Sequence, residues 1–247
     1  MRKVAQIMGM PVSLDIPGED RPSIFEAMFK ELRLVDEQFS PYRVGSELNH
    51  FRRGELKKNQ LSIGMQTVMK ACLEAEKMTD GYFSARYGQE FDPTGYVKGW
   101  AVAEVEHSLL KNDIKTFCLS VGGDVDARSY SDRTWRIGIQ DPRDKKSIIG
   151  KIVGKNFAVA TSGNYERGHH IINPKTGKPA RELLSLTVVG PSIIKADVLA
   201  TAAYAMGKKG LKFIDEKQPG YEVLAVANEG TVFLSGGMHQ LLVRAQP

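Results

Sequence analysis

Two hydrophobic periodicities follow one another along this chain of 247 residues, and their order constrains the fold more than any other feature. Apolar side chains recur at helical spacing in residues 24–35, 63–78 and 97–109, whereas the alternation typical of strands dominates from residue 115 onward. A strict alternation of strands with helices does not occur. This order predicts an α+β fold with largely antiparallel sheets flanked by helices.

Punctuating residues refine this prediction. Ser46 is placed to cap a short helix, and Gly207 is placed to close an alanine-rich helix. "IIGKIV" and "FAVATSG" flank residues 154–156 and predict a hairpin, and a second hairpin is predicted around residues 228–230. Neither a linker nor an internal repeat interrupts the pattern, so we expect one compact domain over residues 1–247.

Charge and cysteine content exclude several classes of protein. The net charge is +5, and the basic runs 52–58 and 145–155 alternate with apolar residues, as solvated strands and turns do. We therefore expect no nucleic-acid binding, although a mild attraction for anionic ligands stays open. Cys72 and Cys118 lack metal-binding spacing and are interpreted as reduced thiols. No apolar run reaches membrane-spanning length and no signal peptide is found, so a cytoplasmic protein is predicted.

The stretch "DPTGYVKG" places an acid, a Thr-Gly turn and a lysine at the start of a predicted helix. The free N–H groups of a helix start attract anions, often phosphates. A lysine on the first turn opposes the helix dipole, so Lys98 suggests a bound anion near Asp92. The alternative is that Asp92 caps the helix and Lys98 is solvated.

A second motif, "KADVLATAAYAMG", places Asp197 and Thr201 four residues apart on one helix. Their side-chain oxygens therefore lie on one face, and one carboxylate with one hydroxyl suits Mg²⁺. The alternative is that Asp197 is an ordinary acid of the first helical turn.

A third segment, "ATSGNYERGHHIINP", ends a predicted strand with Thr161 and Ser162, whose hydroxyls suit phosphate oxygens. His169 and His170 follow as candidate proton acceptors, against the alternative of structural histidines. "LSVGGDV" lacks the third glycine of a dinucleotide fingerprint, and the chain contains no P-loop. The double glycine nevertheless allows a ligand to approach the backbone closely.

Taken in order, these segments resemble one known family. The chain is similar to the FAD:protein FMN transferases of the ApbE family over residues 7 to 207. The matching segments are "IMGMPVSLDI", "FSPYRVGSELNHF", "DPTGYVKGWAV", "LSVGGDV", "WRIGIQDP", "AVATSGNYER", "HHIINPKTGKP" and "LTVVGPSIIKADVLATAAYAMG". The "KG" helix and the "ADxxxT" element together are the most specific of these.

The resemblance implies a T-fold-like domain and a post-translational flavinylation. Such enzymes bind FAD with Mg²⁺, transfer FMN through a phosphoester bond to a threonine of a target flavoprotein, and release AMP. By position, His170 would be the base. The metal ligands would be Gly95, Asp197 and Thr201, and the FAD contacts would be Met8, Tyr42, Tyr82, Phe83, Ser84, Asp92, Lys98, Thr161, Ser162 and Ile172.

Two departures from the family pattern are visible. Only seven residues separate Ser84 from Asp92, where many members carry a long insertion, and Ser84 replaces an acid. The chain also lacks the lipoprotein signal of secreted members, which implies a cytoplasmic acceptor. Two other functions stay open: an Mg²⁺-dependent FAD pyrophosphatase that releases FMN and AMP, and a flavin-binding protein without turnover.

Overall fold

A computed structural model describes residues 1–88, 90–164 and 171–244 of the chain. An antiparallel sheet of eight strands forms its centre, in the order β1-β2-β5-β6-β9-β12-β13-β14. The strands are β1 (Arg2–Ile7), β2 (Met10–Asp15), β5 (Phe117–Val121), β6 (Asp124–Arg128), β9 (Phe157–Gly163), β12 (Leu183–Gly190), β13 (Glu222–Ala227) and β14 (Val232–Leu234).

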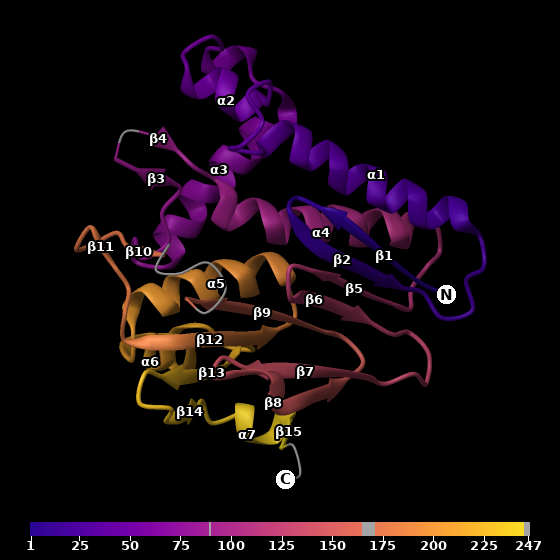
Figure 1. The fold of residues 1–247 in the computed structure, drawn as a ribbon, viewed down its shortest axis with the longest axis vertical. Helices are drawn as coiled ribbons and strands as arrows, with labels where there is room; N and C mark the ends of the chain where they lie inside the picture. Colours follow the sequence, from indigo (N-terminus) through magenta and orange to yellow (C-terminus); the bar gives the residue numbers. More distant parts are fainter. Residues whose placement is uncertain (89, 165–170, 245–247) are drawn as a thin grey trace.

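Helices cover one face of this sheet (Figure 1). The long helices are α1 (Pro22–Phe39), α4 (Thr94–Lys111) and α5 (Ile193–Met206), and α6 (Lys209–Lys217) follows α5. α5 packs on β9 and β12, α4 packs on α5, and α1 packs on α4. Buried apolar side chains from these helices and from the sheet form the larger of two cores.

A second antiparallel sheet covers part of the opposite face. Its order is β15-β8-β7, formed by β7 (Trp135–Asp141), β8 (Asp144–Gly154) and β15 (Leu242–Arg244), with α7 (Met238–Leu241) beside it. Trp135 and Ile139 on β7 and Ile152 on β8 pack against Val125 and Val159 of the large sheet. These side chains form the smaller core.

The predicted hairpin around residues 154–156 is wrong. β8 instead pairs with β7, and β9 pairs with β6 and β12 of the large sheet. Residues 154–156 therefore connect the two sheets. β8 and β9 lie on opposite sides of the smaller core, and both contribute apolar side chains to it. The predicted hairpin of β13 and β14 is confirmed.

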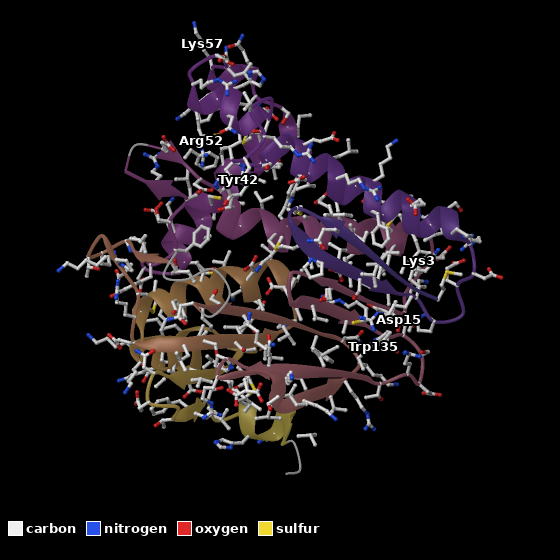
Figure 2. The ribbon with its side chains drawn as sticks, viewed as in Figure 1. Lys3, Asp15, Tyr42, Arg52, Lys57 and Trp135 are labelled. Atoms are coloured by element: carbon white, nitrogen blue, oxygen red, sulfur yellow. The ribbon has the colours of Figure 1, made fainter. Side chains whose placement is uncertain are left out.

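A lobe projects beyond α1 and α4 (Figure 1). It comprises α2 (Glu47–Arg52), the 3₁₀ turn η1 (Lys58–Gln60), α3 (Ile63–Met78) and the short hairpin of β3 (Arg86–Tyr87) and β4 (Glu90–Phe91). Figure 2 shows Lys57, Arg52 and Tyr42 following one another from its tip toward the body. A further two-stranded ribbon is formed by β10 (Ile172–Asn173) and β11 (Lys178–Pro179).

Local signals explain several element boundaries. The Ser46 hydroxyl accepts from the backbone N–H of Asn49 at 3.1 Å, which confirms the predicted cap of α2. Gly207 ends α5 with a φ of 68°, as predicted, because glycine adopts that region without a steric cost. The predicted α+β class with mostly antiparallel sheets is confirmed. Within the described ranges, no helix has both the length and the apolar character needed to cross a membrane.

Candidate functional site

A cavity of about 970 Å³ opens where the two sheets, the lobe and the helices meet. Its wall is formed by the β1–β2 turn, the segment after α1, the starts of α4 and α5, the β5–β6 turn, and parts of β7 and β9. This volume is at the upper end of the range typical of small-molecule and cofactor sites. Elements that lie far apart in the sequence therefore converge on one ligand-sized space.

Lys98 lies in this wall and is the centre of a buried cluster of charges. Its Nζ lies 2.7 Å from Oδ2 of Asp124 and 3.5 Å from Oδ1 of Asp197. The side chain of Lys98 is 22% exposed, and those of the two acids are 1% and 5% exposed. The alternative of a solvated Lys98 is therefore wrong.

Backbone groups hold both carboxylates in place. The N–H of Gly99 donates to Oδ2 of Asp197 at 3.0 Å, and the N–H of Thr161 donates to Oδ1 of Asp124 at 3.1 Å. A Cβ at position 99 would lie 3.1 Å from Cβ of Asp197 and from Cα of Ile194, so glycine permits the close contact of α4 with α5. Asp197 lies beyond the first turn of α5 and faces α4, which rules out the alternative of a first-turn acid.

Burial sets the electrostatics of the cluster. Burial raises the pKa of Asp197 to about 7. The positive charge of Lys98 lowers this pKa, and the negative charge of Asp124 raises it further. Burial alone would lower the pKa of Lys98, but the two carboxylates raise it above the usual value, so the lysine stays protonated. Two acids around one lysine leave the cluster one negative charge in excess when both are ionised.

The residues present fit a hard divalent cation. Oδ2 of Asp124 is buried, and its partner is the ammonium group of Lys98 at 2.7 Å. Thr201 lies in the same wall, with Oγ1 at 3.4 Å from the Ser162 hydroxyl. No group of three or more His, Cys, Asp and Glu side chains suited to a metal occurs in the described part of the chain. A cation at Asp197 and Thr201 would therefore need further oxygen ligands, as Mg²⁺ takes from carbonyls, water and substrate phosphates.

The start of α4 carries a second charged contact. Oδ1 of Asp92 accepts from the N–H of Thr94 at 3.0 Å, as the capping alternative expected, and Asp92 also lines the cavity. Arg52 of α2 lies 3.5 Å from Oδ2 of Asp92, and its Nε donates to the carbonyl of Phe91 at 2.8 Å. The lobe is thereby tied to the mouth of the helix.

Most of the sequence-predicted site residues meet at this cavity. The wall contains Met8, Tyr42, Phe83, Ser84, Asp92, Gly95, Lys98, Thr161, Ser162, Asp197 and Thr201. Tyr42 is 92% exposed at the side of the lobe (Figure 2), whereas Phe83 is buried. Met8 has a φ of 57°, in the left-handed region, and forms the tight β1–β2 turn with Gly9.

Two predicted contacts lie outside the wall. Ile171 lines the cavity in place of Ile172, because neighbouring side chains of an extended segment point in opposite directions. Tyr82 also lies outside it, and its ring faces Nζ of Lys175 at 5.7 Å. His169 and His170 fall outside the described residues.

Sequence reasoning missed Asp124, which is the nearest partner of Lys98. An acid directly after the double glycine of "SVGGDV" was the available signal. Gly122 and Gly123, with φ of 56° and 93°, form the β5–β6 turn and place Asp124 at the start of β6. Reasoning from the sequence also missed Arg52 and the cavity-lining part of β7.

The comparisons with known proteins agree with this arrangement. A sequence model of the ApbE family matches residues 8–92 and 84–225, and the chain therefore belongs to the ApbE family. The FAD:protein FMN transferase of Escherichia coli K12 is 29% identical over 148 residues, which are 55% of this chain and 42% of that protein. The enzyme of the same name from Rhodobacter capsulatus is 29% identical over 190 residues, or 71% of this chain and 36% of that protein. The matched regions thus span less than half the length of these relatives.

Solved structures show the same fold. The flavin transferase ApbE from Vibrio cholerae superposes with a TM-score of 0.82 at 23% identity, covering 98% of this chain and 99% of the other. The ApbE protein from Thermotoga maritima gives a TM-score of 0.86 at 22% identity, covering 99% of both chains. The predicted family and the predicted fold are both confirmed.

Proposed function

We propose that the protein is an FAD:protein FMN transferase acting as one domain over residues 1–247. The observation that carries this proposal is that Lys98, Asp197 and Thr201 share the wall of a cavity large enough for a dinucleotide, with Asp124 paired to Lys98. A cation-binding group and a fixed positive charge at one place are what a pyrophosphate requires. Membership of the ApbE family supports FAD as that dinucleotide.

The proposed reaction is a phosphoryl-type transfer. The hydroxyl oxygen of an acceptor threonine attacks the phosphorus of the FMN half, and a new P–O bond forms. The bond between that phosphorus and the bridging oxygen breaks, and AMP leaves with the bridging oxygen. The threonine proton passes to a base, for which His170 is the candidate from the family resemblance.

Mg²⁺ is the proposed cofactor, held by Asp197, Thr201 and the carbonyl of Gly95. When bound, such an ion supplies positive charge that offsets the charge of the pyrophosphate. Lys98 adds a second positive charge next to this position. The hydroxyls of Thr161 and Ser162 orient phosphate oxygens, and Met8, Tyr42, Phe83 and Ser84 surround the flavin. Asp92 is a further FAD contact, and contacts from Tyr82 and Ile172 stay predictions.

The acceptor is proposed to be a separate flavoprotein that carries the modified threonine. A cytoplasmic location for both proteins also stays a prediction, which cell fractionation would test. Main contacts between enzyme and acceptor must lie around the cavity mouth, because the threonine has to reach the phosphate.

Co-expression with candidate flavoproteins tests the function. We expect one flavoprotein to gain the mass of one FMN on a threonine, and purified protein with FAD and Mg²⁺ to release AMP only when that acceptor is present. AMP and free FMN in the absence of acceptor would instead show a pyrophosphatase. FAD binding without release of AMP under either condition would show a flavin-binding protein without turnover.

A further inference from the structure

β7 is an unpaired sheet edge that borders the cavity. Within the described residues it pairs with β8 on one side only and ends the sheet β15-β8-β7. Four of its residues, 137–140, lie in the cavity wall. In the described residues, the edge strands of the eight-stranded and three-stranded sheets are β1, β14, β15 and β7. Of these four strands, β7 alone contributes to the cavity wall.

The strand is held firmly while its edge stays accessible. Trp135 and Ile139 are buried in the smaller core, and the indole N–H of Trp135 donates to the carbonyl of Arg128 at 2.9 Å. Arg136 and Gly138, on the outer face, are exposed, and Gly138 has no side chain to shield the neighbouring backbone. The strand has no proline, and its only register shifts lie beyond Ile139. Natural proteins usually protect such an edge, because its free N–H and C=O groups bind another strand.

Charge indicates what kind of strand this edge accepts. Residues 132–155, the β7–β8 hairpin and its flanks, contain seven basic and three acidic residues, so they carry +4 of the net +5 of the chain. Arg136 and Lys151 form no ion pair in the described structure, and Lys151 lies opposite Gly138 in the register. A second copy of this chain would bring the same positive charge against itself, whereas an acidic segment would be attracted.

We propose that an extended, acidic segment of the acceptor protein adds to the free edge of β7 as a further strand. This inference rests on the proposed function. Main-chain hydrogen bonds to a sheet edge bind a segment with little demand on its sequence, and alternate side chains then point to fixed positions. The edge runs along the wall that also contains Ser162 and Thr201, so a bound strand brings its threonine into the cavity.

Hydrogen exchange tests the placement of the strand. The probe is the apo form of the flavoprotein that gains FMN on co-expression, added to the FAD-loaded enzyme. We expect slower exchange at alternate amides of residues 135–141, those that are not bonded to β8. Protection elsewhere with none on β7 overturns the inference. Protection of β7 that depends on enzyme concentration without acceptor overturns it in favour of self-association.

A charge reversal tests the same edge by kinetics. We expect Arg136→Glu combined with Lys151→Glu to raise KM for the acceptor about tenfold, with kcat and FAD affinity little changed. The matched control is Lys209→Glu with Lys212→Glu on α6, which changes charge equally away from the cavity and should leave KM unaltered. Equal KM values in the two variants overturn the inference. FAD binding measured by fluorescence verifies that each variant is folded. If the double variant does not fold, Lys151→Gln replaces it, and we expect a smaller increase in KM for the acceptor.

The two levels of failure are distinguishable. Absence of FMN transfer by the native protein overturns the proposed function, and the docking inference falls with it. Normal transfer by the native protein, with neither protection of β7 nor a charge effect, overturns the docking inference alone.

Discussion

Two clusters of buried charge lie at opposite ends of β6, and each has one cation between two acids. At one end Lys98 lies beside Asp124 and Asp197. At the other end Arg128 lies 2.7 Å from Glu106 and 2.7 Å from Asp126. Of the two clusters, only the first contributes to the cavity wall, through Lys98 and Asp197.

The difference between the cations explains the difference in role. Arg128 has a planar fork of donors and also donates to the carbonyl of Pro191 at 3.0 Å, so it joins β6 to α4 and to the segment before α5. Lys98 is a compact point charge that can attract further oxygens without fixing them in one plane. We therefore infer that the arginine end stabilises the fold, whereas the lysine end is available for ligands.

The largest expected effect comes from removing an acid at the lysine end. Asp197→Ala should lower Mg²⁺-dependent FMN transfer by roughly 1,000-fold or more, because the proposed cation site loses its carboxylate ligand and the negative charge of that ligand. Thr201→Val should be milder, since a neutral hydroxyl contributes less than a carboxylate. Transfer kinetics at increasing Mg²⁺ measure both effects. Glu106→Gln, the matched loss of an acid at the arginine end, should retain transfer within about threefold; equal losses at the two ends would contradict the division of roles.

His170, which lies outside the described residues, is the candidate base and tests whether proton transfer is separate from charge stabilisation. His170→Ala should bind FAD nearly as well as the native protein but transfer FMN about 100-fold more slowly, the usual range for a lost general base. His169→Ala is the control and should be much milder. Mass spectrometry of the acceptor measures the rate. Native rates in both variants would place the base elsewhere.

A smaller effect is expected from removing the lysine of the first cluster. Lys98→Ala should raise the dissociation constant of FAD roughly tenfold or more, because a charge-assisted contact of about 1.5–3 kcal/mol is lost. Fluorescence titration with FAD measures this constant. Arg128→Lys should leave it unchanged while reducing the free energy of unfolding, and unchanged FAD affinity in Lys98→Ala would remove the lysine end from the binding site.

The smallest expected effect is a pH dependence at the arginine end. Burial raises the pKa of Asp126 to about 7. The charge of Arg128 lowers this pKa, and the charge of Glu106 raises it. A raised carboxyl pKa gives stability that is complete below the unfolded value, near 4, and that is lost as the pH rises through about 7. Asp126→Asn should remove this part of the decline. Urea unfolding at about pH 5 and about pH 8 measures it, and an identical difference in both proteins would refute the assignment.

The sequence predicted most helices and the β13–β14 hairpin, but it did not predict how β8 and β9 pair. Val97, Ala101, Val105 and Leu109 repeat at helical spacing and are all buried on α4, because this periodicity is local. β8 and β9 alternate equally well on either side of a turn-like segment, yet they belong to different sheets. Strand pairing depends on long-range burial, which a local pattern does not contain.

The candidate site was predictable only in part for a similar reason. Asp92, Lys98, Asp197 and Thr201 stood in recognisable local motifs. Asp124 is the first of two acids in a short strand, and its contact with Lys98 arises only when β6 packs near α4. Arg52 and the edge of β7 gained their significance from neighbours that are remote in the sequence.

The bare backbone at Gly99 has a consequence for how the site comes into being. α4 and α5 are in contact there without an intervening side chain. This contact fixes the distance between Lys98 on α4 and Asp197 on α5. α5 holds Asp197 and Thr201 and α4 holds Lys98, so neither helix alone holds the complete cluster. A fragment ending before residue 193 would keep Lys98 and lose Asp197, and a chain split between the helices would recover the site only by reassembly. Packing of α4 on α5 is thus a precondition for the complete cluster, which makes ligand binding a reporter of that contact.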